Sequence, residues 1–192
     1  MGLDLSTKTG WAVLDTNGGL SGYGHLIVKD GNQYELVQDY AMISRAENIA
    51  SQIEQAIQLH TPDKIIIEQT NLGKNRTSQK MLEFVHYAVL KVIQKIGYAD
   101  RVIYLDTSQW RSRLKITFSK EQREHNKRVN KHLARGKITQ KHLAVLYVNS
   151  KFNLSLLIGQ NDIADAICLA ECGLHDLSKI KQINVNLDDV FG

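Results

Sequence analysis

The order of periodic segments predicts an α/β protein whose five-stranded mixed sheet carries helices on both faces. Three short strand patterns open the chain, and a hairpin signal, Asn17-Gly18-Gly19, separates the second from the third. Strand and helix patterns then alternate as far as residue 105, which is typical of parallel strands joined by helices. We therefore expect three antiparallel strands, then two parallel strands, and further helices after the sheet.

Each element follows from the spacing of its apolar residues, which recur every second residue in strands and every three or four in helices. The predicted strands cover residues 3–7, 11–15, 20–28, 64–69 and 101–105. The predicted helices cover residues 34–59, 77–96, 137–152 and 162–172, with a short helix around Trp110. We expect Gly97 to close the helix over 77–96, Asn161 to cap the last helix, and Thr107 or Ser108 to cap the short one.

The composition is that of an ordinary globular protein, with 192 residues and 43% hydrophobic side chains. No linker or repeat is visible, so residues 1–192 are expected to form one domain. Cys168 and Cys172 lie one helical turn apart, which favours buried core thiols over a disulfide framework or a zinc site. With no secretion signal and no membrane span in the sequence, we expect a cytoplasmic protein.

Positive charge is concentrated in one segment, residues 111–142. This segment holds eleven Lys or Arg and two Glu, a local net charge of +9, whereas the whole chain has a net charge of only +4. The remainder therefore carries −5. Such asymmetry indicates a polyanionic partner, although a solvated basic face without a ligand is the alternative.

Four carboxylates stand at the edges of core-forming segments: Asp4, Glu68, Asp162 and Asp165. Acids are rare in such segments unless they are paired or bind metal. Asp162 and Asp165 are three residues apart and thus share one side of a helix. Each acid also has an ordinary interpretation, such as a first-turn acid for Asp162, an ion pair for Asp4 or a strand exit for Glu68. Together they favour a site for Mg²⁺ or Mn²⁺ that holds two ions and hydrolyses phosphodiesters.

Three motifs resemble those of the RuvC-like Holliday junction resolvases, which belong to the RNase H-like superfamily. The first is Gly2-Leu3-Asp4-Leu5-Ser6 with Thr9-Gly10-Trp11-Ala12, and the second is Ile66-Ile67-Glu68-Gln69. The third, Asp162-Ile163-Ala164-Asp165-Ala166, is similar to the Asp-x-x-Asp-Ala helix of that family. The resemblance extends from Gly2 to about Leu174 and implies that the four acids are the metal ligands.

The resemblance further implies a homodimer that nicks two strands of a four-way DNA junction and leaves 5′-phosphate and 3′-hydroxyl ends. Lys137 and Lys141 resemble the basic pair that contacts the scissile phosphate. The helix with Met81, Val85, Val89 and Val92 is then a candidate dimer interface, and a core-facing helix is the alternative. The residues expected to contact DNA are Lys74, Arg111, Arg113, Lys127, Arg128, Lys131, Arg135, Lys137 and Lys141.

Several side chains allow two interpretations. His125, His132 and His142 belong to the basic segment and are expected to add DNA affinity rather than chemistry. Trp110 and Tyr147 are expected to pack in the core rather than stack on bases. Asn71 occupies the position of an aromatic residue that wedges into the junction in bacterial members. A longer basic run than in compact bacterial members suggests a phage- or virus-type relative.

Three other functions remain open. A nuclease of the same fold acting on flaps, forks or RNA–DNA hybrids needs the same metal site. A non-catalytic module would bind branched DNA whether or not Mg²⁺ is present. Asp4-Leu5-Ser6-Thr7-Lys8 also resembles the phosphate strand-turn of actin-like sugar kinases, but those enzymes need two such lobes and a glycine-rich loop.

Overall fold

The computed structural model describes residues 1–28, 38–69, 76–133 and 135–175. Five strands form one sheet in the order β3-β2-β1-β4-β5. Their bounds are β1 (Gly2–Asp4), β2 (Lys8–Leu14), β3 (Leu20–Ile27), β4 (Ile65–Glu68) and β5 (Val102–Leu105). The pairs β1–β2 and β2–β3 are antiparallel, whereas β4 lies parallel to both β1 and β5. The predicted mixed sheet is therefore confirmed.

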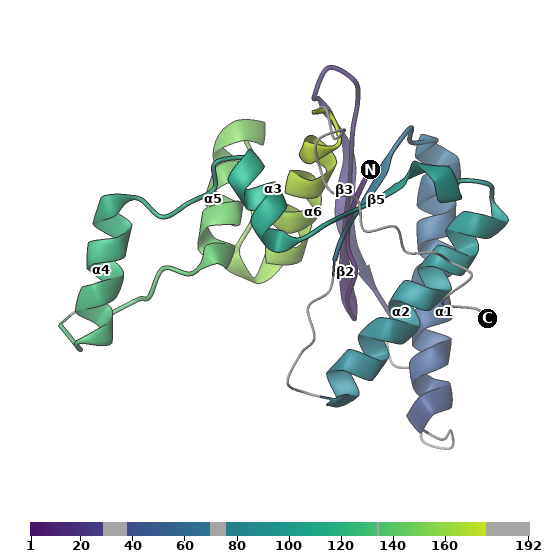
Figure 1. Ribbon diagram of the computed structural model, residues 1–192, viewed down its shortest axis with the longest axis horizontal. Helices are drawn as coiled ribbons and strands as arrows, with labels where there is room; N and C mark the ends of the chain where they lie inside the picture. The colour runs from purple at the N-terminus through teal and green to yellow at the C-terminus, as the bar shows by residue number, and fades with distance from the viewer. Residues whose placement is uncertain (29–37, 70–75, 134, 176–192) are drawn as a thin grey trace.

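Helices cover both faces of the sheet, as predicted (Figure 1). One face carries α1 (Gln38–His60) and α2 (Arg76–Lys95), which pack side by side. The other carries α3 (Thr107–Arg113), α5 (Gln140–Phe152) and α6 (Asn161–Cys172). A further helix, α4 (Lys120–Asn130), stands away from the sheet, and Ala99–Arg101 and Ile158–Gln160 are short 3₁₀ turns. None of the described helices is long and apolar enough to cross a membrane.

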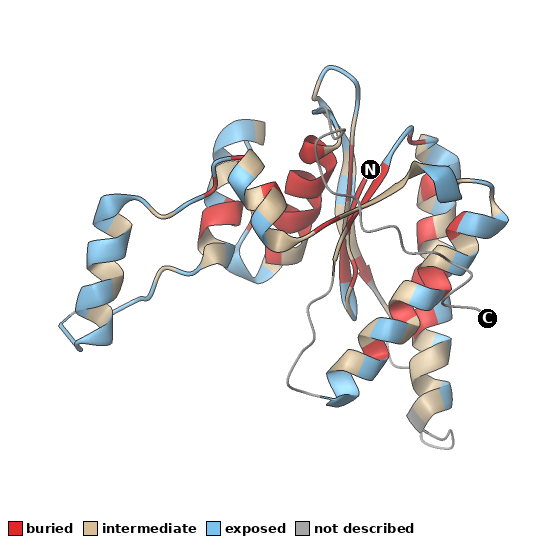
Figure 2. Ribbon diagram, viewed as in Figure 1, coloured by how far each residue is buried: buried red, intermediate tan, exposed pale blue. Residues whose placement is uncertain are grey.

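The alternation of side chains along β1 and β4 sends their acids to the α6 face of the sheet. Leu3 is fully buried in the core beneath α1 and α2, as are Ile65 and Ile67. Ile66 belongs instead to the core beneath α6. Successive side chains in a strand point to opposite faces, so Asp4 and Glu68 emerge beside α6. Figure 2 shows the two buried layers on either side of the sheet.

Helix α6 lies almost in contact with the backbone of β1 and β2. A Cβ atom on Gly2 would lie 2.1 Å from the carbonyl oxygen of Ala166, and one on Gly10 would lie 2.0 Å from that of Asp162. Only glycine permits this approach. Every residue of α6 except Asp162 is buried, because the helix is covered by the sheet, α3 and α5. Its position relative to the strands is thus fixed by close packing.

The helix ends differ from the prediction at two places and agree with it at a third. Asp106, rather than Thr107 or Ser108, caps α3, because its side chain accepts from the amide of Gln109 at 2.8 Å. Asn161 is the first residue of α6 and not its cap, which is Gln160. Gly97 does close α2, with a left-handed φ of +78°.

Helix α4 is absent from the sequence-based prediction. It contains no buried residue, so it has no apolar stripe for periodicity to detect. Its start is set by a capping box: the Ser119 hydroxyl accepts from the amide of Gln122, and the Gln122 side chain accepts from the amide of Ser119.

The apolar face of α2 turns toward the sheet. Met81, Val85 and Val89 are buried in the core, which supports the core-facing alternative for these three residues, whereas a role of α2 in a dimer interface stays a prediction. Val92 is only partly buried and lines a groove between α1 and α2. Trp110 is fully buried, and Cys168 and Cys172 are free buried thiols, which confirms their core assignments.

Candidate metal centre

Three of the four predicted acids meet at one point on the α6 face. Asp4 ends β1, Glu68 ends β4, and Asp165 lies on the inner side of α6. The pairing of Leu3 with Ile67 places Asp4 and Glu68 at neighbouring strand ends. One carboxylate oxygen from each of the three acids lies within 4.8 Å of the other two. The fold therefore gathers donors from the first strand, the middle of the chain and the last helix.

Burial and mutual repulsion raise the pKa values of these acids. Burial raises the pKa of Asp4 well above its usual range, and the charges of Glu68 and Asp165 add to this. The pKa of Asp165 rises to about 7, chiefly through burial and then through Glu68. Burial also raises the pKa of Glu68. Three carboxylates crowded in a poorly solvated site disfavour their charged forms unless a cation joins them.

The donor set fits a hard divalent cation. Carboxylate oxygens are the ligands that Mg²⁺ and Mn²⁺ prefer. Asp165 Oδ1 is buried and has no hydrogen-bond partner among the described residues, although buried polar atoms are almost always satisfied. A cation between the three carboxylates would supply the missing partner. Asp4, Glu68 and Asp165 are therefore the residues that would hold it.

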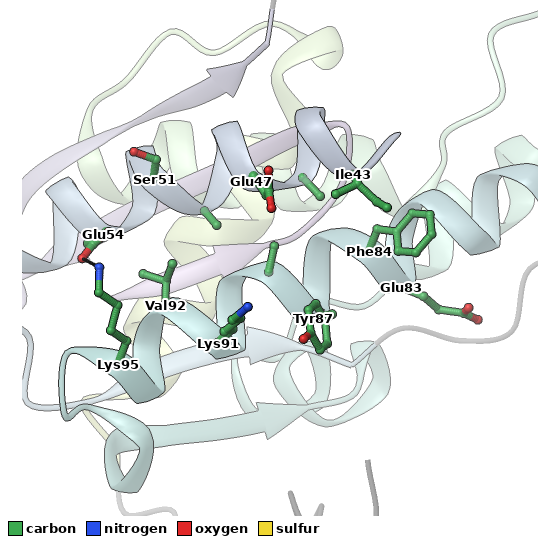
Figure 3. A pocket seen from close by; sticks show the side chains of 13 residues that line it. Ile43, Glu47, Ser51, Glu54, Glu83, Phe84, Tyr87, Lys91, Val92 and Lys95 are labelled. Atoms are coloured by element: carbon green, nitrogen blue, oxygen red, sulfur yellow. Dashed lines mark ion pairs between the residues drawn. The ribbon is translucent and has the colours of Figure 1, made fainter. Parts of the chain in front are cut away.

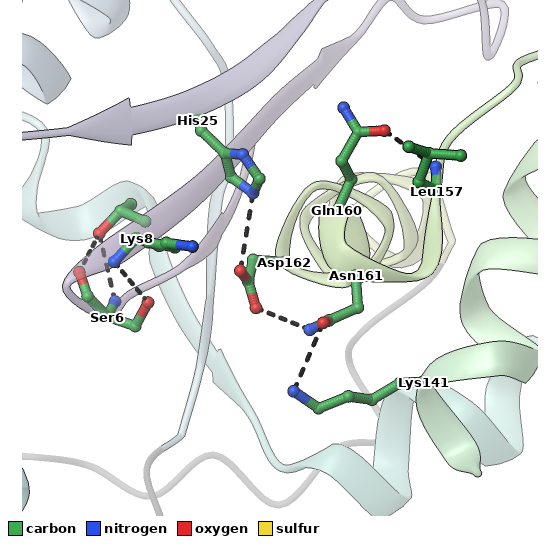
Figure 4. Close-up of polar contacts among 9 residues, drawn as sticks. Ser6, Lys8, His25, Lys141, Leu157, Gln160, Asn161 and Asp162 are labelled. Atoms are coloured by element: carbon green, nitrogen blue, oxygen red, sulfur yellow. Dashed lines mark hydrogen bonds and ion pairs between the residues drawn. The ribbon is translucent and has the colours of Figure 1, made fainter. Parts of the chain in front are cut away.

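Asp162 lies beside this group but is engaged elsewhere (Figure 4). Its Oδ1 accepts from the side-chain amide Nδ2 of Asn161 at 2.7 Å, and its Oδ2 lies 3.6 Å from His25 Nε2 on β3. Asp162 still contributes to the raised pKa values of Asp4 and Asp165. The structure thus brings together three of the predicted ligands and directs the fourth toward His25 and Asn161.

Two side chains of α3 approach the acids from the end of β5. The Thr107 hydroxyl donates to Glu68 Oε1, and this bond lowers the pKa of Glu68 against the effect of burial. The charge of Arg111 lowers the pKa values of both Glu68 and Asp165. The Arg111 guanidinium carbon lies 4.7 Å from the centroid of the Trp110 ring, which supports it from behind.

The two predicted lysines occupy different places. Lys141, in the first turn of α5, donates to Asn161 Oδ1 at 3.4 Å, and its charge lowers the pKa values of Asp4 and Asp165. Lys137 is exposed on the segment between α4 and α5. Lys141 is therefore part of the immediate surroundings of the acids, and a role for Lys137 at the scissile phosphate stays a prediction.

The remaining basic residues are distributed over the surface of the α4 region. Lys127, Arg128, Lys131 and Arg135 are exposed or partly exposed there. Arg113 lies near Cys172, whose thiol pKa it lowers against the stronger effect of burial. Lys74 and Asn71 lie outside the described residues.

Aromatic and histidine side chains give a mixed result. Tyr147 is partly buried, and its hydroxyl donates to buried Glu171 at 2.8 Å, which favours the core interpretation. His125 and His142 bind within their own segment, to the carbonyl of Gly136 at 2.9 Å and to the hydroxyl of Thr139 at 2.7 Å. His132 is exposed and has a left-handed φ of +59°.

Sequence reasoning missed His25, Thr107 and Asn161 as neighbours of the acids. His25 pairs with Gly10 across β2 and β3, so only the strand register reveals its position. The position of Thr107 could have been predicted, because it follows the fifth predicted strand by two residues and so lies at the same sheet edge as Glu68. Asn161 was interpreted as a cap, whereas its side chain links Lys141 to Asp162.

The fold has counterparts among solved structures, whereas no family model and no curated protein matches the sequence. T. thermophilus RuvC in complex with a Holliday junction substrate aligns over 88% of this chain and 87% of its own, with a TM-score of 0.61 and 16% identity. A second structure of Thermus thermophilus RuvC aligns with a TM-score of 0.55 and 17% identity, over 88% of this chain and 89% of its own. The yeast mitochondrial Holliday junction resolvase Ydc2 aligns with a TM-score of 0.48 and 12% identity, over 90% of this chain and 76% of its own. The two RuvC structures show that the chain has the fold of RuvC, as the three sequence motifs had suggested.

Proposed function

We propose that this protein is a metal-dependent endonuclease that cuts four-way DNA junctions. The observation that carries the proposal is the convergence of Asp4, Glu68 and Asp165, with ligand oxygens within 4.8 Å of one another and one buried oxygen unpartnered among the described residues. A RuvC fold surrounds this group over nearly the whole chain, and one structural counterpart is bound to a Holliday junction. The resemblance of the motifs adds the expected products, a 5′-phosphate and a 3′-hydroxyl.

Each group around the acids has a distinct part in this chemistry. A divalent ion held by the three carboxylates would acidify a bound water and stabilise the leaving oxygen. Lys141 and Arg111 supply positive charge beside the acids, where a scissile phosphate would lie. Thr107 fixes one oxygen of Glu68 and leaves the other for the cation. Asp162, which contacts Asn161 and His25, lies beside the three acids as the candidate ligand of a second ion.

We further propose that the basic segment holds the DNA backbone. Helix α4 projects from the body on two extended linkers (Figure 1) and buries none of its side chains. Asn126 fastens the returning linker by a pair of hydrogen bonds with the backbone of Ile138, at 2.8 and 2.9 Å. A basic helix that adds nothing to the core is suited to phosphates, which it would contact without reading bases.

We also propose that two copies pair through the groove between α1 and α2. The buried residues of α2 face the core and take no part in this interface. The groove has a volume of about 620 Å³, and Ala46, Ala50, Phe84 and Val92 give it an apolar floor. Figure 3 shows Glu47 and Glu54 along α1 and Glu83, Lys91 and Lys95 along α2, where Lys95 pairs with Glu54 at 3.5 Å across the groove.

The charges of this groove favour a second copy over an unrelated partner. With the two-fold axis along the groove, the α1 edge of each copy faces the α2 edge of the other, so Glu47 of one copy meets Lys91 of the second copy. Tyr87 is 46% exposed beside the groove and offers an aromatic contact at the centre of the interface. A dimer with two active sites would be able to cut both strands of one junction, one in each copy.

The deciding experiment compares a labelled four-way junction, a fork, a flap, an RNA–DNA hybrid and linear duplex in Mg²⁺, Mn²⁺ or EDTA. We expect paired symmetric nicks on the junction with either metal and none with EDTA. Cleavage confined to flaps, forks or hybrids would keep the nuclease and change its substrate. Junction binding without cleavage, equal with and without Mg²⁺ and unaffected by Asp4→Asn, would identify a non-catalytic module.

A further inference from the structure

A second concave site lies along α3, and Thr107 links it to the three acids. It is an open cavity of about 550 Å³, and its lining residues include no Asp or Glu. Arg111 and Lys115 supply positive charge, and hydroxyls come from Thr107, Ser112 and Thr117. Cations and hydroxyl donors without an opposing acid are suited to an anion.

Two side chains join this cavity to the metal centre. Thr107 lines the cavity and donates to Glu68 Oε1. Arg111 also lines it, and its charge acts on Glu68 and Asp165. An anion in the cavity would therefore be an immediate neighbour of whatever occupies the metal centre.

Two buried polar atoms at the cavity have no partner within the described chain. Arg111 Nε and Gln140 Oε1 are both inaccessible to solvent and make no hydrogen bond with the described residues. Buried polar groups without partners are rare and indicate a bound water, ion or ligand. The Arg111 guanidinium can donate to a phosphate oxygen, whereas the unpartnered oxygen of Gln140 is an acceptor and suits a water or a hydroxyl donor.

The conformation of Lys115 is an independent observation. Helix α3 ends in a turn in which the amide of Ile116 donates to the carbonyl of Arg111 at 2.9 Å, and that of Lys115 donates to Ser112 at 3.1 Å. This is the Schellman arrangement, whose left-handed position glycine normally occupies. Lys115 takes that position here with φ +56°. Leu114 and Ile116 are buried on either side of it and hold the turn in place.

A lysine where glycine would be free of strain suggests that its side chain has a use. Lys115 is exposed and lines the cavity together with Arg111. The fixed turn therefore presents a positive charge to the cavity at a constant position.

We propose that this cavity binds a phosphate of the DNA backbone adjacent to the phosphate that is cut. This inference rests on the proposed nuclease function and adds a second anchoring point on the strand. Arg111 lies between the two phosphates, and Lys115 contacts only the uncut one. The bound phosphate orients the DNA strand along α3, so that one phosphodiester bond faces the acids.

The test is a scan of neutral methylphosphonate linkages across the branch point of a four-way junction, with binding measured in EDTA to prevent cleavage. Wild-type protein is expected to lose affinity several-fold at one linkage near the cut. Lys115→Gly should bind unmodified junction more weakly, with a salt slope smaller by about 1. It should show no further loss at that linkage and normal losses elsewhere.

Matched variants separate the charge from the turn. Lys115→Gly relieves the left-handed conformation, so its melting temperature should be unchanged or higher. Lys115→Arg should retain the affinity and Lys115→Gln should lose it. Lys64→Gln, which removes a charge at the opposite end of β4, and Asn153→Gly, at another left-handed position, should bind like the wild type.

The two proposals fail in different ways. If the scan shows the same profile for wild-type protein and Lys115→Gly, the cavity binds no phosphate, whether or not the protein cuts junctions. If the linkage-specific effect is present but no metal supports cleavage, the phosphate site stands and the nuclease proposal fails.

Discussion

At the scale of single residues, the cluster of Asp4, Glu68 and Asp165 is a local instability that a cation would relieve. Three crowded carboxylates, one buried and two partly buried, repel one another, and the pKa of Asp165 rises to about 7 through burial and its charged neighbours. Such sites favour function over stability. Removing one acid should therefore affect stability and activity in opposite directions.

Asp165→Asn should stabilise the metal-free protein and abolish cleavage. At pH 8 we expect the free energy of unfolding to rise by about 1–4 kcal/mol, because each pKa unit corresponds to about 1.4 kcal/mol. Thermal unfolding with and without Mg²⁺ should show stabilisation by metal in the wild type only. Cleavage should fall by more than about 100-fold, the upper range for residues that merely support a ligand. Wild-type nicking by this variant would remove Asp165 from the site.

His86 gives a separate, pH-dependent prediction. Burial lowers its pKa to about 4, and its Nδ1 lies 3.5 Å from the Tyr104 hydroxyl. Between about pH 6.5 and 4 the unfolded chain therefore binds more protons at His86 than the folded chain, so stability falls as the pH falls through this range. Between about pH 7 and 4.5, wild type should lose about 2 kcal/mol more than His86→Phe. Equal losses in urea titrations of both proteins would contradict the lowered pKa.

At the scale of elements, the contact of α6 with β1 and β2 sets the height of Asp165 above Asp4. Gly10 pairs with Asp4 across the two strands and lies directly under the first turn of α6. The acids can only meet if the helix approaches this closely. A change on the strand should therefore reach the metal centre without touching a ligand.

Gly10→Ala should separate α6 from the sheet, since its methyl carbon would lie 2.0 Å from the Asp162 carbonyl oxygen. We expect a decrease of at least about 1–3 kcal/mol in stability and a weaker stabilisation by Mg²⁺. Gly159→Ala is the matched control, because nothing lies within 4 Å of its added carbon. It should remain within about 0.5 kcal/mol of the wild type. Similar melting curves for both variants would show that α6 adjusts freely.

The sequence predicts elements well where buried residues recur at regular spacing. It predicts poorly those features that depend on contacts between distant segments. The strands and the helices beside the sheet follow from apolar spacing, and the acids Asp4, Glu68 and Asp165 follow from their places in those elements. Helix α4 could not be found, because it buries nothing. The contact of His25 with Asp162 depends on strand register and helix position together, which no local pattern contains.

At the scale of the whole molecule, pairing through the α1–α2 groove makes a charge-reversal prediction. Lys91→Glu should shift a dimer toward monomer, because it would face Glu47 or Glu54 of the other copy. The double variant Glu47→Lys with Lys91→Glu should restore the dimer in sedimentation or light scattering. A wild-type protein that is monomeric at all accessible concentrations would contradict the pairing.

The projecting α4 region makes a prediction about DNA affinity alone. Changing Arg128, Lys131 and Arg135 to Gln should leave thermal stability within about 0.5 kcal/mol of the wild type, because none of these side chains is buried. The slope of log affinity against log salt should decrease by up to about 3, since each phosphate that the variant no longer neutralises reduces it by about 0.9. Single-turnover cleavage at saturating protein should stay unchanged. An unaltered salt slope would place α4 away from DNA.

Because α4 shares no core with the sheet, its sequence is free of the constraints that packing imposes on the rest of the chain. Phe118 and Ile138, which pack against the core beneath α6, mark the two ends of this independent segment. An exchange between these points would place a new nucleic-acid-binding element on an unchanged body. The projecting helix is thus a natural place to engineer which nucleic acids the protein binds.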